Sequence, residues 1–224
     1  MLCASTSNER LCWRTWPCPA CSRGITPIGY LVGGYQTGKV VRSNVVEEVA
    51  KQEADRLKQW VANCSHTTQV CVELPKISEG SEHIVYLDQG DTSVVKTTKP
   101  GIFGESYYLV NGAINQRNCS PLDYLIRLRL WKKVFGSAPV ALGITDLGQI
   151  VTKHKFIAGK PPEQAIVDDF LIKAGLEPVK QKFWLWKKSY PIDEFEIGVG
   201  DARADNFVIG DSGIVPIDLR LWFA

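Results

Sequence analysis

Three polar residues near the C-terminal end of the sequence have types and spacing that suit metal-assisted chemistry: Asp201, Asn206 and Asp218. Carboxylate and amide oxygens are ligands that Mg²⁺ takes from a protein while water and phosphate oxygens fill the rest of its shell. Asp201 lies on the loop before the other two and can orient a hydroxyl group and accept its proton. We therefore predict that Asn206 and Asp218 bind Mg²⁺ and that Asp201 is a catalytic base.

A predicted β-hairpin brings the two metal ligands together. Phe207–Ile209 and Ile214–Ile217 are apolar runs, and Gly210–Gly213 between them has the composition of a tight reversal. Neighbouring antiparallel strands lie about 4.8 Å apart, so the residue that enters the first strand lies beside the residue that leaves the second. The other interpretation of the segment is a surface turn that is rich in carboxylates.

A second predicted hairpin, further upstream, has the features of a phosphate-binding corner. Strand-forming residues follow Gly80 and Ser81, Gln89–Asp91 is typical of a turn, and Ser93–Lys96 of the returning strand. Small residues let backbone N–H groups approach phosphates closely. We predict that Gly80, Ser81 and Lys96 bind a nucleotide cofactor. The corner holds a single glycine, and an ordinary hairpin with a solvated lysine is the alternative.

The sequence resembles the protein-kinase-like and aminoglycoside-phosphotransferase-like superfamily, and is most similar to the compact kinase-like domains in the polyvalent proteins of phages and conjugative elements. The resemblance covers roughly residues 75 to 222 and lies in Glu79–Glu82, Val85-Tyr86, Val94–Lys96, Lys99–Gly104, Pro121–Leu125, Gly200–Asn206 and Ile217-Asp218. It implies an α+β, bilobal fold with a small β-rich N-lobe and a reduced C-lobe. It also implies ATP and Mg²⁺ as cofactors, Lys96 on the phosphates, Asp201 as the base, and Asn206 with Asp218 on the metal.

The sequence departs from the superfamily pattern beside two of these residues. Val199 stands two residues before Asp201, where relatives usually carry histidine, and Leu219-Arg220 follows Asp218 in place of Phe-Gly. Six residues follow Asp218, which makes us expect no activation segment. We expect transfer of the γ-phosphoryl group of ATP to an unidentified hydroxyl acceptor, either a small molecule or a protein. A nucleotide-binding pseudokinase that regulates a partner, and a structural domain that binds no nucleotide, are the alternatives.

The resemblance also requires an acidic partner for Lys96 from a helix between the lobes. Ser120 as N-cap, Pro121 at the first helical position and Asp123 two residues later predict a helix start, and Gly136 lies past its end. The helix contains no glutamate. Asp123 and Glu105 are both candidates, and we leave the partner of Lys96 unassigned.

We divide the chain into three parts: a Cys- and Trp-rich N-terminal segment (1–43), for which disorder is one interpretation, a connector with an amphipathic helix (44–74), and the kinase-like domain (75–224).

An odd number of cysteines, seven, argues against a disulfide framework. The one close pair, Cys18 and Cys21, is weak evidence for zinc. Gly33–Lys39 matches part of a phosphate-binding loop but lacks the following Ser or Thr, which favours a surface turn.

The composition is that of a globular protein, with 45% hydrophobic and 22% charged residues and a net charge of +2. No apolar stretch approaches the length of a membrane span, and the near-neutral charge offers no basic stripe for a nucleic acid. We therefore expect a cytoplasmic protein with neither a membrane nor a nucleic acid as its partner.

Overall fold

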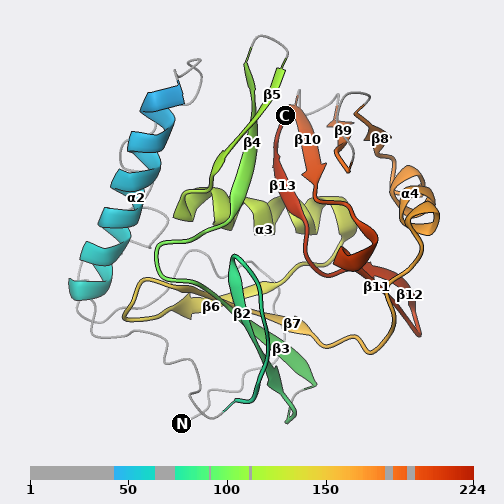
Figure 1. Cartoon of the computed structure of the whole chain (residues 1–224), viewed down its shortest axis with the longest axis horizontal. Coiled ribbons are helices and arrows are strands. Elements are labelled where there is room, and N and C mark those ends of the chain that lie inside the picture. The colour runs from blue at the N-terminus through green and yellow to red at the C-terminus, as the bar shows by residue number, and fades with distance from the viewer. Residues whose placement is uncertain (1–42, 64–73, 91, 111–112, 180–183, 191–194) are drawn as a thin grey trace.

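The computed structural model describes residues 43–63, 74–90, 92–110, 113–179, 184–190 and 195–224 (Figure 1). It is a mixed structure of helices and antiparallel sheets, as the predicted α+β class requires. Two sheets lie apart from each other in Figure 1, and helix α3 (Pro121–Phe135) passes behind strands β4 and β13. Cys18, Cys21 and Gly33–Lys39 lie outside the described residues, so the interpretations of those segments stay predictions.

The first sheet has five strands in the order β1-β2-β3-β7-β6. Their bounds are β1 (Lys76–Glu79), β2 (His83–Asp88), β3 (Ser93–Thr98), β6 (Val140–Ile144) and β7 (Ile150–Lys155). The predicted hairpin is confirmed: β2 and β3 pair antiparallel, with Val85 opposite Lys96. On its other side Lys96 is opposite Thr152 of β7, so the lysine stands on the central strand of the sheet.

The second sheet has four strands in the order β13-β10-β9-β8. Their bounds are β8 (Glu177–Pro178), β9 (Trp186–Tyr190), β10 (Phe195–Gly200) and β13 (Arg220–Phe223). Between β10 and β13 the chain forms a 3₁₀ turn, η1 (Ala204–Asn206), and then the predicted hairpin of β11 (Phe207–Gly210) and β12 (Gly213–Pro216). This second hairpin is also confirmed, with Phe207 opposite Pro216.

Helix α3 starts where the sequence predicts. The Ser120 side chain accepts from Asp123 N at 3.1 Å, and the Asp123 carboxylate accepts from Ser120 N at 2.9 Å, which together form a capping box. Gly136 ends the helix in the left-handed conformation, with φ 76°. A third sheet precedes the helix, the hairpin of β4 (Glu105–Val110) and β5 (Ala113–Asn118), which rises at the top of Figure 1.

The hydrophobic residues form two cores, and α3 contributes to both. One core joins α3 to helix α2 (Ser43–Asn63) and the first sheet, and its buried residues include Leu57, Trp60, Val61, Phe103, Tyr124, Leu125, Leu128, Ile144 and Ile150. The other joins α3 to helix α4 (Gln164–Lys173) and the second sheet, through Leu130, Trp131, Val134, Val167, Leu171, Trp186, Ile197, Val199, Phe207, Leu219 and Leu221. The two ends of α3 therefore hold two separately packed parts of the chain. None of the helices in the described part of the chain is long and apolar enough to cross a membrane.

A buried carboxylate lies where α2 packs against the start of α3. The Glu53 side chain is only 2% exposed, and its Oε2 accepts from Leu122 N at 3.4 Å while its Oε1 has no partner. Burial raises the pKa of Glu53 above its usual value, although the Ser120 hydroxyl opposes this by donating to the carboxylate. Ionised Glu53 therefore costs folding free energy.

We expect Glu53→Gln to stabilise the protein at pH 8 relative to wild type, by about 1 kcal/mol. A carboxyl group whose pKa is higher in the folded than in the unfolded state lowers the free energy of unfolding as the pH rises above the unfolded pKa of about 4.3. The difference in free energy of unfolding between Glu53→Gln and wild type should therefore shrink towards pH 5. Urea unfolding at the two pH values measures it. Glu48→Gln, on the exposed face of the same helix, is the control. Identical pH profiles for wild type and Glu53→Gln would contradict the assignment.

Candidate active site

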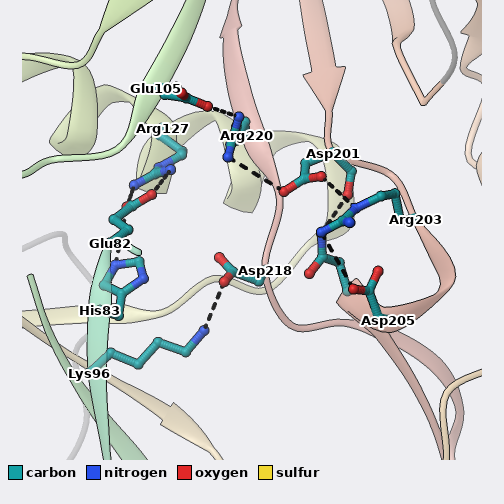
Figure 2. A network of polar contacts seen from close by, with 11 residues as sticks. Glu82, His83, Lys96, Glu105, Arg127, Asp201, Arg203, Asp205, Asp218 and Arg220 are labelled. Carbon is teal, nitrogen blue, oxygen red and sulfur yellow. Dashed lines mark hydrogen bonds and ion pairs between the residues drawn. The ribbon is translucent and has the colours of Figure 1, made fainter. Parts of the chain in front are cut away.

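Lys96 reaches from the first sheet to the segment that joins β12 to β13 (Figure 2). Its Nζ donates to the backbone carbonyl of Ile217 at 2.9 Å and lies 3.9 Å from Asp218 Oδ2. The Lys96 side chain is 15% exposed, whereas half of the Asp218 side chain is accessible. These contacts join residues that are more than a hundred positions apart and make Asp218 the ionic partner of Lys96.

Neither acid that the sequence offered as a partner contacts Lys96. The Asp123 carboxylate accepts two hydrogen bonds from Arg117, at 2.7 and 2.9 Å, and caps α3. The Glu105 carboxylate pairs with Arg220. Both candidates are thus held by arginines.

The predicted metal ligands lie side by side, as the hairpin geometry requires. The backbone carbonyl of Asn206 accepts from Ile217 N at 2.8 Å and from Asp218 N at 3.4 Å. The Asn206 side chain in turn donates from Nδ2 to the backbone carbonyl of Asp201 at 2.7 Å. The structure therefore brings Lys96, Asp201, Asn206 and Asp218 together through direct contacts.

Asp201 directly follows β10 and has a left-handed backbone, with φ 58°. That conformation costs about 1 kcal/mol or more for a residue with a Cβ. Its carboxylate Oδ1 accepts from Arg203 Nε at 2.8 Å, and Oδ2 lies 3.8 Å from Arg220 Nη2 (Figure 2). Its carbonyl also accepts from Arg203 N at 2.8 Å. Surrounding contacts thus hold a conformation that the backbone alone disfavours.

The loop that follows Asp201 is also held from α4. Gln164, the first residue of that helix, donates from Nε2 to the Ala202 carbonyl at 3.0 Å and accepts from Ala204 N at 3.0 Å. A side-chain amide that satisfies both a backbone donor and a backbone acceptor fixes the loop between them. The sequence contained no signal for this contact, because Gln164 becomes a neighbour of the loop only in the folded chain.

The predicted phosphate-binding corner, Gly80 and Ser81, is exposed between β1 and β2. Gly80 N donates to the His83 carbonyl at 2.9 Å, and a Cβ built on Gly80 would meet nothing within 4 Å. Among the described residues, no hydrogen bond or ion pair joins the corner to Asp201, Asn206 or Asp218. Packing therefore does not require glycine at position 80, and the space beside it is open.

A buried ion pair that sequence reasoning missed lies directly behind this corner. Glu82 pairs with Arg127 of α3 through both carboxylate oxygens, with Arg127 Nη1 at 3.3 Å from Oε2 and Nη2 in contact with Oε1. The Arg127 side chain is 4% exposed. A Cβ on Gly104, which has φ 81°, would overlap the Glu82 carboxylate. An arginine among the apolar residues of a predicted helix is the signal that could have indicated a buried acidic partner.

The electrostatics of these groups follow from burial and from their neighbours. Burial alone would raise the pKa of Glu82, but Arg127 holds it below its usual value. Although half of the Asp218 side chain is accessible, the protein atoms around its carboxylate would raise its pKa by desolvation, but the nearby positive charges, that of Lys96 above all, hold the pKa below its usual value. Burial lowers the pKa of His83 to about 4, so its ring is neutral at pH 7. The His83 Nε2 lies 2.9 Å from the Tyr124 hydroxyl and 3.2 Å from Glu82.

The residues at the end of the hairpin fit a magnesium ion that arrives with phosphate. Within the described residues, no group of three or more His, Cys, Asp or Glu side chains forms a metal cluster. Asn206 and Asp218 are adjacent and could supply an amide and a carboxylate oxygen. Mg²⁺ takes one or two protein carboxylates and completes its shell with water and substrate phosphates. The donor set therefore suits Mg²⁺ bound together with a nucleotide.

One family model matches the chain, over residues 50–221, and it describes a serine/threonine/tyrosine kinase found in polyvalent proteins. No curated protein and no solved structure matches. The matched range starts within α2, ends within β13 and includes the first sheet and all of the residues that meet around Lys96. It confirms the kinase-like resemblance that the sequence motifs indicated. The chain belongs to the family of serine/threonine/tyrosine kinases found in polyvalent proteins.

Proposed function

We propose that the protein transfers the γ-phosphoryl group of ATP to a hydroxyl acceptor. The observation that carries this proposal is the contact chain from Lys96 through Ile217 and Asp218 to Asn206 and Asp201. It brings together a cation that could face phosphates, two residues whose oxygen atoms suit Mg²⁺ and a carboxylate that could act as a base, which are the parts that phosphoryl transfer needs.

The two cores support a bilobal arrangement in which ATP binds between the first sheet and the second. Lys96 stands on the first sheet, whereas Asp201 directly follows β10 of the second sheet, and Asn206 and Asp218 lie at the two open ends of the β11–β12 hairpin. Because Lys96 donates to the Ile217 carbonyl, its ammonium group points at the segment that carries Asp218, one of the two proposed metal ligands. Arriving phosphate oxygens would offer Lys96 a stronger, charged acceptor than a backbone carbonyl.

In this proposal the hydroxyl oxygen of the acceptor bonds to the γ-phosphorus while Asp201 accepts the hydroxyl proton. The bond between the γ-phosphorus and the oxygen that bridges it to the β-phosphate breaks, which releases ADP. Mg²⁺ held by Asn206 and Asp218 would neutralise charge on the phosphates. The family description favours a serine, threonine or tyrosine hydroxyl as the acceptor. A carboxylate offers about four lone-pair positions, so Asp201 keeps acceptor capacity beside its arginines.

A nucleotide-binding pseudokinase is the second candidate, and one observation favours it. Val199, at the position where relatives usually carry histidine, is completely buried in the core that joins α3 to α4 and the second sheet. An apolar side chain there cannot hydrogen-bond to the loop that carries Asp201. Turnover of ATP distinguishes the two candidates.

Mg²⁺–ATP should stabilise the wild type more than ATP with EDTA does, by RT ln(1 + [L]/Kd), about 2.7 kcal/mol at a hundredfold excess over Kd. Asp218→Ala should remove the part that depends on the metal, because it deletes a carboxylate ligand. Thermal unfolding with and without Mg²⁺ measures this. Asp211→Ala, on the exposed turn at the other end of the same hairpin, is the control. An unchanged Mg²⁺ increment in Asp218→Ala would show that the ion binds elsewhere.

Gly80→Val should leave the melting temperature unchanged, because the new side chain meets open space. If phosphates lie against the corner, the valine should weaken ATP binding about tenfold or more, or about 1.4 kcal/mol. Isothermal titration with ATP and Mg²⁺ measures the affinity. Gly90→Val, in the turn at the opposite end of the β2–β3 hairpin, is the matched control. Equal affinities for the two variants would remove Gly80 from the nucleotide site.

Asp201→Asn should lower ATP turnover by roughly 10²- to 10⁴-fold, because the amide keeps the shape of the side chain but cannot take the proton. ATP affinity should change little, since the proposed phosphate and metal contacts come from other residues. ADP release with water as the acceptor is the assay, and Asp169→Asn on the exposed face of α4 is the control. A wild type that binds Mg²⁺–ATP but releases no ADP would favour the pseudokinase.

A further inference from the structure

Arg220 links the proposed base to the β4–β5 hairpin. In the register of β10 and β13 it is opposite Gly200, the residue before Asp201. One terminal nitrogen of its guanidinium group, Nη1, donates to the Glu105 carboxylate at the start of β4, and the other, Nη2, lies 3.8 Å from Asp201 Oδ2 (Figure 2). In the kinase pattern that the sequence resembles, glycine stands at the position of Arg220.

The two carboxylate oxygens of Asp201 face two different guanidinium groups. Arg203 donates to Oδ1 at 2.8 Å, and Arg220 lies near Oδ2. The terminal torsion of an aspartate is soft and broad, so one contact alone leaves the carboxylate free to turn. A second cation on the other oxygen selects one orientation. A general base depends on that orientation, because its lone pair must meet the proton it accepts.

Glu105 is placed to orient Arg220 in turn. The guanidinium group is a rigid planar fork, so fixing one of its terminal nitrogens on Glu105 directs the other towards Asp201. The hairpin that carries Glu105 packs closely against β10 and β13. The centroids of the Tyr107 and Trp222 rings are 4.7 Å apart, and a Cβ on Gly200 would lie 2.7 Å from the Tyr107 ring. Burial would lower the pKa of Arg220, but Asp201 and Glu105 raise it, so the group stays charged.

We propose that Arg220 and Glu105 are positioning residues for phosphoryl transfer: Glu105 orients Arg220, and Arg220 holds the Asp201 carboxylate in the orientation that accepts the proton. This inference rests on the proposed phosphotransferase function. It makes the β4–β5 hairpin part of the support of the base.

The accessibility of the Arg220–Glu105 pair distinguishes a positioning role from a purely structural one, which would lower the stability of the protein when the pair is removed. The Arg220 and Glu105 side chains are 23% and 37% exposed, and ion pairs of such accessibility contribute little to folding. Removing the pair should therefore leave the protein folded and its nucleotide affinity intact. The effect should fall on kcat, because only the orientation of the base changes.

The test compares Arg220→Gln, Arg220→Lys, Glu105→Gln and the double variant Arg220→Gln/Glu105→Gln, with ADP release as the assay. We expect Arg220→Gln to lower kcat by about 10- to 100-fold, the size of effect that misplaced catalytic groups produce, with the KM for ATP within about twofold of wild type. Glu105→Gln should lower kcat less. The double variant should resemble Arg220→Gln, because Glu105 acts only through Arg220. Arg220→Lys should recover part of the activity, since an ammonium group cannot contact both carboxylates as a fork.

Glu196→Gln is the matched control. Glu196 lies on β10, the strand that leads to Asp201, and its carboxylate accepts from Lys187 at 3.2 Å with comparable exposure. Its loss should leave kcat unchanged, and the melting temperature of every variant should stay within about 4 °C of wild type.

The outcomes separate this inference from the function on which it rests. A wild type that binds Mg²⁺–ATP without turnover contradicts both. A wild type that releases ADP, together with an Arg220→Gln variant that keeps its kcat, contradicts the positioning role alone. A raised KM for ATP in Arg220→Gln would show that Arg220 acts on the nucleotide. Additive losses of kcat in the double variant would show that Arg220 acts independently of Glu105. Either result also overturns the positioning role. If Arg220→Gln fails to fold, Glu105→Gln and Arg220→Lys still decide the question through kcat.

Discussion

Helix α3 packs into two hydrophobic cores at once, and the rest of the structure depends on that double burial. Its N-terminal half lies against α2 and the first sheet, and its C-terminal half against α4 and the second sheet. Each fully buried large apolar side chain contributes about 1.5–3 kcal/mol, so neither half can move without losing a core. The helix consequently fixes Arg127, and through it Glu82, the residue that follows the Gly80-Ser81 corner.

The site is built from alternating charges that hold one another. Glu82 faces Arg127, Asp218 faces Lys96, and Asp201 lies between Arg203 and Arg220 (Figure 2). A partly buried charge without a partner would be costly, and a pair recovers much of that cost through attraction. The pairing therefore keeps these charged groups in place without a metal cluster among the described residues.

The departures from the kinase pattern can be understood from the same packing. Val199 is buried in the core beneath the loop and cannot hydrogen-bond to Asp201. The orientation of Asp201 therefore depends on polar contacts outside that core, from Arg203, from Arg220 and from Gln164, which binds the neighbouring backbone. A carboxylate held in this way depends on several parts of the chain. The strained φ of Asp201 is consistent with a position that its surroundings over-determine.

The local elements of this protein were determined by the sequence itself. Turn composition and alternating apolar runs predicted both hairpins, and Ser120, Asp123 and Gly136 predicted the limits of α3, because hairpins and helix caps depend on residues that are close in the chain. The hairpin spacing also predicted that Asn206 and Asp218 lie together. The partners of the charged residues were decided only by the tertiary structure. Lys96 with Asp218, Glu82 with Arg127, and Arg220 with Glu105 and Asp201 are contacts between distant segments. For Lys96 the sequence offered Asp123 and Glu105, which were chemically suitable, but the folded chain brings Asp218 to it, because contacts between distant segments depend on how those segments pack.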